Sequence, residues 1–281
     1  MAVRTSYTNI ALLRRILLYL VLATFVGYFL VPIYMVLLTS FKPFAEVSVA
    51  SMWLWPQNPS LQGFAHSLRR LGPNLLNSFF LVIPATIISA LFGSVNGYVF
   101  SKFRFKYANL IFALILFGMF IPYQSILIPL VQFLRNIGVY GRLSGLIITH
   151  VIYGIPITTL MFRNFYAEIP DELLDAGFMD GLGIYSTYLR VMVPLSKPGF
   201  TVVAIWQFTS IWNDFLFAVT ITQRPSVQPI TVALQNLAGS QVVEWNVQMA
   251  GAIIAALPTL AMYILLGKLF IRGMLSGSVK G

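Results

Sequence analysis

Residues 75–100 read LLNSFFLVIPATIISALFGSVNGYVF, and this stretch decides the fold because it contains no charged side chain. A helix needs about 20 predominantly apolar residues to cross the hydrocarbon core of a bilayer, and the stretch exceeds that length. It therefore predicts a helix that spans a membrane.

Five further runs are long and predominantly apolar, so the sequence predicts an all-α, polytopic membrane protein with six spans. The run that begins at Ile16 follows Arg14 and Arg15, as a signal peptide would. It is longer than the roughly 7–15 apolar residues of a signal peptide, so we expect a retained span. We expect a single transmembrane domain over residues 1–281, with spans at about 16–40, 75–100, 108–133, 143–165, 199–222 and 247–271.

Composition excludes several classes of protein. Only 9% of the residues are charged and 58% are hydrophobic, whereas a soluble domain carries about 25% charged residues. The absence of cysteine excludes disulfides, thiolate metal sites and cysteine nucleophiles. Two histidines far apart, His66 and His150, do not indicate a metal or haem site, and we expect no metal. The net charge of +10 lies in short loops, so we expect lipid and not nucleic acid as the partner.

The basic residues also predict the orientation. With the N-terminus inside, twelve of the 18 lysines and arginines fall on the cytoplasmic side and six on the outer side. Three of the twelve lie within the short loop Lys102–Lys106. Because positive loops stay in the cytoplasm, both termini are expected there.

The expected loop at residues 166–198 carries five of the eight acidic residues. Pro170 and the N-cap residue Asp171 predict the start of a short helix, and Gly181 predicts its end. The i, i+3, i+4 spacing of Leu173, Ala176 and Gly177 predicts one face with small residues, opposite an acidic face. Physical reasoning leaves two interpretations open: a solvated acidic connector, or a helix that docks into a partner.

The order of residues in this loop resembles the EAA loop of permeases in ABC importers. Asp175, Ala176 and Gly177 stand at the Glu-Ala-Ala positions, with Asp for Glu and Gly for the second Ala as departures. The resemblance implies a coupling helix that sits in a cleft of an ATP-binding subunit. The residues that it implies for coupling to the ATPase are Glu172, Asp175, Ala176, Gly177, Asp180, Gly181 and Pro194.

The resemblance extends to carbohydrate permeases of the maltose type, through Asn77-Ser78, Asn96–Tyr98, Trp212–Phe215 and the tail Gly273–Gly281. Residues 118–125 and 156–164 look most like permeases of glucose and mannose systems. The resemblance implies a subunit of the bacterial inner membrane that moves a small sugar or glucoside by alternating access. It also implies a second, non-identical permease in a heterodimer, two ATP-binding subunits and an extracytoplasmic sugar-binding protein.

No Gly-x-x-x-x-Gly-Lys-Ser/Thr stretch occurs in the chain, so the sequence predicts no ATP hydrolysis here. This chain is therefore not expected to be an enzyme or to hold a cofactor. ATP and Mg are expected on the partner ATPase subunits.

A polar stripe marks the expected fifth span. At 100° per residue, Trp206, Gln207, Thr209, Ser210, Asn213 and Asp214 fall on about 160° of one face. Such a stripe lines a translocation cavity, where amides and carboxylates bind sugar hydroxyls, or packs against other helices. The candidates for the cavity are Trp206, Gln207, Ser210, Asn213, Asp214 and, in the third span, Gln124. For His150 and Tyr153 we expect packed, hydrogen-bonded roles.

Two other functions remain open. A stand-alone secondary transporter or channel needs an ion-coupling site, for which Asp214 is the one serious intramembrane carboxylate, and an inverted repeat is not evident. A membrane enzyme is the other, but no nucleophile motif appears. Uptake without ATP would favour the transporter, and product analysis would reveal the enzyme.

Overall fold

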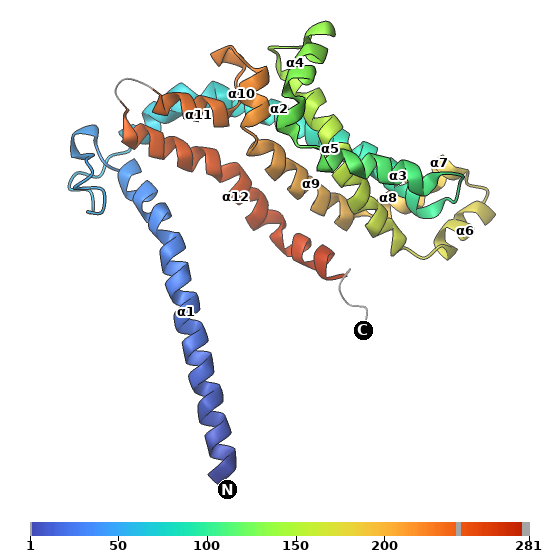
Figure 1. The fold of residues 1–281 in the computed structure, drawn as a ribbon, viewed down its shortest axis with the longest axis horizontal. Coiled ribbons are helices and arrows are strands. Elements are labelled where there is room, and N and C mark those ends of the chain that lie inside the picture. Colours follow the sequence, from blue (N-terminus) through green and yellow to red (C-terminus); the bar gives the residue numbers. More distant parts are fainter. Residues whose placement is uncertain (1, 240–242, 277–281) are drawn as a thin grey trace. The chain divides into compact units, whose positions relative to one another are not determined.

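The computed structural model describes residues 2–239 and 243–276, and this part of the chain contains helices and no strands (Figure 1). The last five residues of the tail Gly273–Gly281, on which part of the resemblance rests, lie outside the described residues. The all-α prediction is thus confirmed for the described chain.

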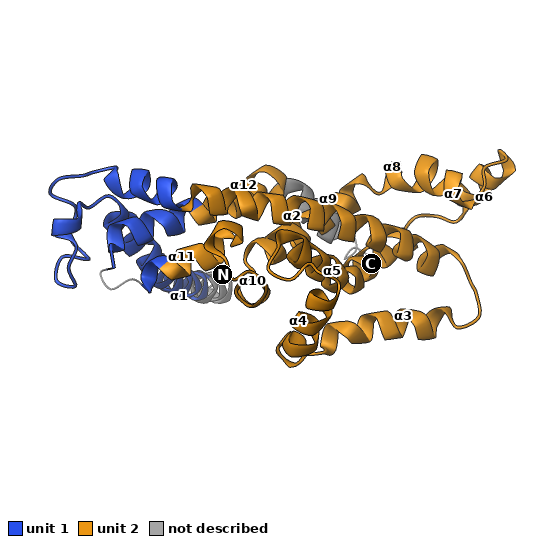
Figure 2. Cartoon of the chain, turned by 90° about the horizontal axis from the view of Figure 1, so that it is seen from above, with its two compact units in different colours: residues 1–70, 237–254 blue, residues 71–236, 255–281 orange. Residues whose placement is uncertain are grey.

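The chain divides into two compact units (Figure 2). The first contains residues 1–70 and 237–254, with helix α1 (Ala2–Ser40), the 3-10 helix η1 (Phe44–Glu46) and the starts of α2 (Gln62–Lys102) and α12 (Trp245–Ser276). Within this unit Arg70 pairs with Glu244 at 2.5 Å. Helix α2 begins well before Leu75, the expected start of the second span.

The second unit holds residues 71–236 and 255–281, including most of α2. Its remaining helices are α3 (Ala108–Phe117), η2 (Gly118–Phe120), η3 (Tyr123–Ile126), α4 (Leu127–Asn136), α5 (Leu143–Ala167), α6 (Glu172–Met179), α7 (Ile184–Thr187), the π-helix η4 (Tyr188–Met192), α8 (Val193–Leu195), α9 (Lys197–Trp212), α10 (Leu216–Ile221), η5 (Pro225–Val227) and most of α11 (Ile230–Ala238). In Figures 1 and 2, α6 lies at one end of this unit, away from α10.

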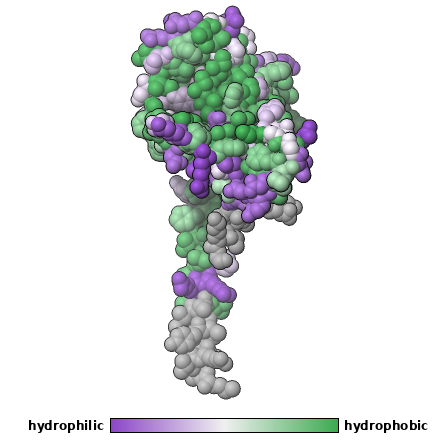
Figure 3. All heavy atoms as spheres, turned by 90° about the vertical axis from the view of Figure 1, so that its right-hand side faces the viewer, coloured by the Kyte–Doolittle hydropathy of each residue, from purple (hydrophilic) through white to green (hydrophobic). Residues whose placement is uncertain are grey.

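Among the described residues, four helices are long and apolar enough to cross a membrane: Leu12–Ser40, Gln62–Lys102, Leu143–Ala167 and Trp245–Gly267. They correspond to the expected first, second, fourth and sixth spans. Apolar side chains cover much of the face seen in Figure 3, and Phe80, Leu114 and Phe117 are exposed. Such a surface suits contact with lipid because it needs no hydrogen bonds from water.

The expected third and fifth spans are not continuous helices. The third is a pair, Ala108–Phe120 and Tyr123–Asn136, bent by 91°. Pro122 lies at the break, where it has no N–H to donate and holds Ile121 in an extended conformation. The fifth is divided into α9 and α10 by residues 213–215.

Small residues let α2 approach α5 closely within the second unit. A Cβ at Gly93 would overlap Thr158, and one at Gly97 would overlap the backbone of Phe162. The Thr158 hydroxyl donates a 3.0 Å hydrogen bond to the backbone oxygen of Ser89. This packing through small and hydroxyl residues is typical of helices that associate in membranes.

Candidate functional site

All predicted site residues except Gln124 lie in two regions of the second unit: the loop around α6, called here the α6 loop (residues 166–198), and a cavity beside α9 and α10. Asp171 precedes α6, as predicted, but its side chain makes no cap hydrogen bond and its backbone is already helical. Its carboxylate instead accepts a 2.6 Å hydrogen bond from Nζ of Lys102. This bond and the lysine charge hold the pKa of Asp171 below its ordinary value.

The predicted end of α6 is confirmed and has a defined mechanism. Gly181 adopts a left-handed conformation with φ of 79°, which glycine tolerates because it lacks a Cβ. The Leu182 N–H donates to the Gly177 oxygen and the Gly181 N–H to the Phe178 oxygen, both at 3.0 Å. These two bonds form a Schellman motif, which closes the helix.

The predicted small-residue face of α6 is only partly correct. Leu174 and Gly177 are the buried residues of the helix, whereas Leu173 and Ala176 are exposed. A Cβ at Gly177 would lie 3.4 Å from Cγ2 of Thr187, so Gly177 packs against its own chain. The other residues implied for coupling are exposed: Glu172, Asp175, Ala176, Asp180, Gly181 and Pro194.

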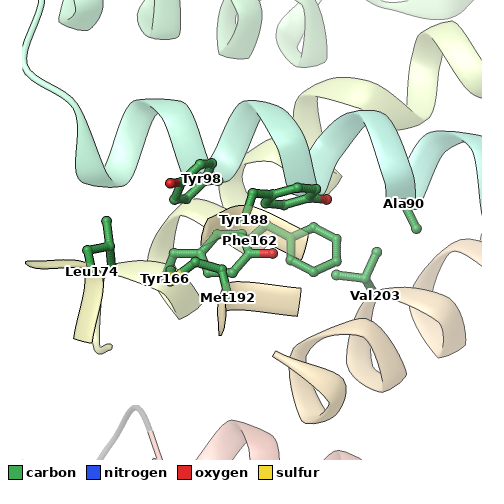
Figure 4. Close-up of a cluster of buried hydrophobic side chains, with 8 residues drawn as sticks. All are labelled: Ala90, Tyr98, Phe162, Tyr166, Leu174, Tyr188, Met192 and Val203. Atoms are coloured by element: carbon green, nitrogen blue, oxygen red, sulfur yellow. The ribbon is translucent and has the colours of Figure 1, made fainter. Parts of the chain in front are cut away.

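Leu174 of α6 belongs to a buried, largely aromatic cluster that the sequence did not predict (Figure 4). Ser94 Oγ lies 2.6 Å from the Tyr166 hydroxyl and accepts a 2.9 Å hydrogen bond from the Tyr188 hydroxyl. The Tyr166 hydroxyl also lies 3.2 Å from Ser196 Oγ, and Tyr98 donates to the Ile184 oxygen. We call these five side chains (Ser94, Tyr98, Tyr166, Tyr188 and Ser196) the tyrosine cluster. It joins α2 and α5 to the α6 loop.

The second region is a cavity of about 470 Å³ beside α5, α9 and α10. Five of the six predicted cavity residues line it: Trp206, Gln207, Ser210, Asn213 and Asp214. Gln124 does not line it, although its neighbour Tyr123 does. Ile211 and Phe215 also line it, and Phe215 lies beyond Trp212, the last residue of α9.

Asp214 supports the helix break. Its Oδ2 accepts a 3.0 Å hydrogen bond from the Ala218 N–H, and its Oδ1 lies 3.4 Å from the Phe217 nitrogen. A side-chain oxygen that binds the first free N–H groups stabilises the start of a helix, here α10. The sequence does not predict this role, because its apolar run predicts one continuous span with Asp214 in the interior.

Gln207 belongs to the packing between helices rather than to an open wall. It is 3% exposed, and its Nε2 donates a 3.0 Å hydrogen bond to Ser89 Oγ. A Cβ on Gly154 would overlap that same Nε2. The two interpretations of the polar stripe therefore apply to different residues: Gln207 packs against α2, whereas Trp206 and Ser210 are exposed along α9.

His150 departs from its expected role. The side chain is buried in the cavity wall, and its ring meets Phe217 edge to face at 5.7 Å between centroids. Nε2 lies 3.5 Å from Asp214 Oδ2 but has no hydrogen-bond partner among the described residues. The predicted packing is confirmed, but the predicted hydrogen bonding is wrong for Nε2. Among the described residues, no group of three or more acidic or histidine side chains could hold a metal ion.

Comparison with known proteins gives consistent results. Residues 83–275 match the family described as "Binding-protein-dependent transport system inner membrane component". A probable ABC transporter permease protein of Pyrococcus horikoshii is 47% identical over 268 residues, covering 95% of this chain and 98% of that protein. The xylose/arabinose import permease protein of Haloferax volcanii is 35% identical, covering 93% and 92% respectively.

A solved structure shares the fold. A subunit of a bacterial ABC transporter that imports the acidic polysaccharide alginate superposes with a TM-score of 0.81 and 21% identity, covering 91% of this chain and 95% of that one. The family match extends over well over half of the chain, from α2 into α12. This chain therefore belongs to the family of inner-membrane components of binding-protein-dependent transport systems.

Proposed function

We propose that this chain is the permease subunit of an ATP-driven importer that moves a small sugar or glucoside by alternating access. Family membership supports binding-protein-dependent import across the inner membrane. The relative from Haloferax volcanii, which is named for xylose/arabinose import, supports a sugar as cargo. The polar and aromatic lining of the cavity is compatible with such a solute.

The proposed topology has six spans in a single permease domain over residues 1–281, with both termini in the cytoplasm. The bent pair Ala108–Phe120 and Tyr123–Asn136 forms the third span, and α9 with α10 forms the fifth. Broken helices are tolerated in membranes where the free backbone groups line a cavity or find partners. The carboxylate of Asp214 supplies such partners at the start of α10.

The proposed partners are a second, non-identical permease, two ATP-binding subunits that hold ATP and Mg, and an extracytoplasmic sugar-binding protein. The observation that carries the coupling role is the exposed arc of α6. At 100° per residue, Leu173, Asp175, Met179 and Asp180 lie on both sides of Ala176 around the helix, and all five are exposed. A small residue at the centre of an exposed arc allows a partner's cleft to approach the helix closely.

The proposed solute path uses the cavity residues that are not engaged in packing. Trp206, Ser210, Asn213 and Asp214 line it. Gln207 instead positions α9 against α2, and Gln124 has no place in the cavity lining.

Ala176→Arg tests the docking role. The large charged side chain should block the approach of the ATP-binding subunit without disturbing the buried face of α6. We expect binding of the ATP-binding subunit to weaken by about tenfold or more, since a few lost contacts at an interface centre have that effect, and ATP-driven uptake to fall with it. Ala50→Arg is the matched control, because Ala50 is also exposed but lies in the first unit.

If Ala176→Arg leaves both the binding of the ATP-binding subunit and the ATP-driven uptake unchanged, α6 does not have the docking role. Gly177→Glu is a poorer test, since Gly177 faces Thr187 and the variant would disrupt the loop itself. Uptake by the purified chain in liposomes without ATP or partners would instead favour a secondary transporter.

A further inference from the structure

The wall of the cavity contains a buried nitrogen with unused hydrogen-bonding capacity. His150 is 7% exposed, and its Nε2 has no hydrogen-bond partner within the described chain. A buried polar atom without a partner destabilises the fold unless something else supplies the missing bond. Because the cavity is bounded by this side chain, a bound solute could supply it.

Asp214 supplies acceptors beside this nitrogen. An ionised carboxylate has about four lone-pair sites, and the Phe217 and Ala218 N–H groups use one on each oxygen. The remaining sites can accept hydroxyl hydrogens from the cavity. His150 Nε2 and Asp214 Oδ2, 3.5 Å apart, form a pair of polar atoms spaced to meet one or two neighbouring hydroxyls of a ring.

Aromatic rings surround this pair. Tyr123, Tyr153 and His150 all contact the ring of Phe217, with centroids 5.5, 5.0 and 5.7 Å away. Trp206 lines the same cavity and is half exposed. Aromatic faces pack against the apolar C–H face of a sugar, so the cavity joins a hydroxyl-binding pair to a stacking surface.

The cavity lining contains one acidic residue, Asp214, and no lysine or arginine. A carboxylate on the solute would meet a like charge at short distance, beside an Asp214 side chain that is 14% exposed, and like charges repel strongly where water is partly excluded. The lining therefore disfavours acidic sugars, although the solved transporter that shares this fold imports an acidic polysaccharide.

From these features we infer that this subunit itself holds one ring of an uncharged sugar during transport. His150 Nε2 and Asp214 bind its hydroxyls, and Asp214 excludes sugar acids. The inference rests on the proposed function and deepens it, because it assigns both the solute site and its charge selectivity to this chain. The same pair would be a purely structural contact if no solute bound there.

The test uses the complete transporter in nanodiscs without its binding protein, so that selectivity comes from the membrane subunits alone. The probes are D-glucose and D-glucuronate, which differ only at the C6 carboxylate. Binding is followed by tryptophan fluorescence, with Trp206→Phe to assign the signal. We expect saturable binding of glucose and at least about tenfold weaker binding of glucuronate, as expected for an uncompensated like charge.

Two variants separate the roles. His150→Phe keeps an aromatic ring but removes Nε2, and it should weaken glucose binding by about tenfold, the cost of one lost polar contact, while His150→Gln should restore part of it. Asp214→Asn keeps an oxygen to accept hydrogen bonds at the start of α10 but removes the charge. It should narrow the preference for glucose over glucuronate to about twofold, since the repulsion between two carboxylates is gone.

Equal binding of the two sugars to the unmodified transporter would overturn the inference, as would unchanged glucose binding in His150→Phe. No glucose binding at all would also overturn it. Each variant is checked for ATPase activity, to show that the complex is assembled. If the complex still imports sugar with ATP but does not show the expected binding, the inferred sugar site is wrong and the proposed function stands. If uptake needs no ATP, the proposed function itself is wrong.

Discussion

The ammonium group of Lys102, at the end of α2, lies 2.6 Å from Oδ1 of Asp171, the residue before α6. The lysine side chain is 3% exposed and the aspartate 80%. Lys102 also donates to the backbone oxygen of Ile169. One buried lysine thus ties the end of a membrane-spanning helix to the start of the α6 loop, 69 residues later in the sequence.

Lys102→Met should weaken this connection between α2 and the α6 loop. Methionine can occupy the space of the lysine stem but leaves the Ile169 oxygen without its donor. Because an unsatisfied buried group costs about 1–3 kcal/mol, amide hydrogen exchange across residues 172–179 should accelerate by about tenfold or more. Lys106→Met is the matched control, since Lys106 is exposed. Equal rates of amide hydrogen exchange in Lys102→Met and Lys106→Met would show that Lys102 does not stabilise the α6 loop.

The stabilisation of the α6 loop by the Lys102–Asp171 pair should also depend on pH, and it should be lost only at low pH. Lys102 lowers the pKa of Asp171, so the ionised pair stabilises the loop above the ordinary aspartate pKa of about 3.9. This stabilisation is lost as the pH falls through the lowered value. Exchange of α6, corrected for intrinsic rates, should therefore stay constant from neutral pH to about pH 4 and rise only below it. Asp171→Asn should abolish this dependence; an unchanged profile in that variant would assign the transition to another group.

The tyrosine cluster gives a separate prediction. Tyr188→Phe removes the hydroxyl that donates to Ser94 and leaves the ring in place. The loss of one buried hydrogen bond should destabilise the protein by about 1 kcal/mol and lower the thermal midpoint of the purified protein. Tyr185→Phe, at an exposed tyrosine three residues earlier, should leave it unchanged.

The cluster also joins the loop to two spans, so its loss should impair transport more than ATP hydrolysis. We expect Tyr188→Phe to lower the number of sugar molecules imported per ATP in the reconstituted complex. A parallel fall in both rates, with the ratio kept, would indicate a stability effect alone.

Close packing of α5 against α9 is tested by Gly154→Ala. The added methyl group would overlap Nε2 of Gln207 and force it away from Ser89. Overpacking of this kind typically costs about 1–3 kcal/mol, so the thermal midpoint should fall. At Gly27, in α1, a Cβ would meet nothing within 4 Å. Gly27→Ala should therefore keep or raise the midpoint, because alanine favours helix, and a fall there as large as that of Gly154→Ala would contradict the packing argument.

Local features of the sequence were sufficient for several parts of this protein. Long apolar runs predicted the four continuous spanning helices, because the thickness of a bilayer demands a minimum length of apolar chain. Pro170 and Gly181 predicted the bounds of α6, since proline fixes its own backbone and glycine readily adopts the left-handed conformation that ends a helix. The polar stripe predicted most of the cavity lining from residues within one short segment.

Other features depend on residues that are distant in the sequence, so only the tertiary structure decided them. Whether Gly177 or Ala176 faces outward is set by Thr187, which packs on one side of α6. The pairing of Lys102 with Asp171 likewise depends on segments far apart in the sequence. So does the burial of His150 Nε2 without a hydrogen-bond partner among the described residues. The helical period states which residues share a face, but the neighbours of that face determine whether it is buried or free to bind a partner.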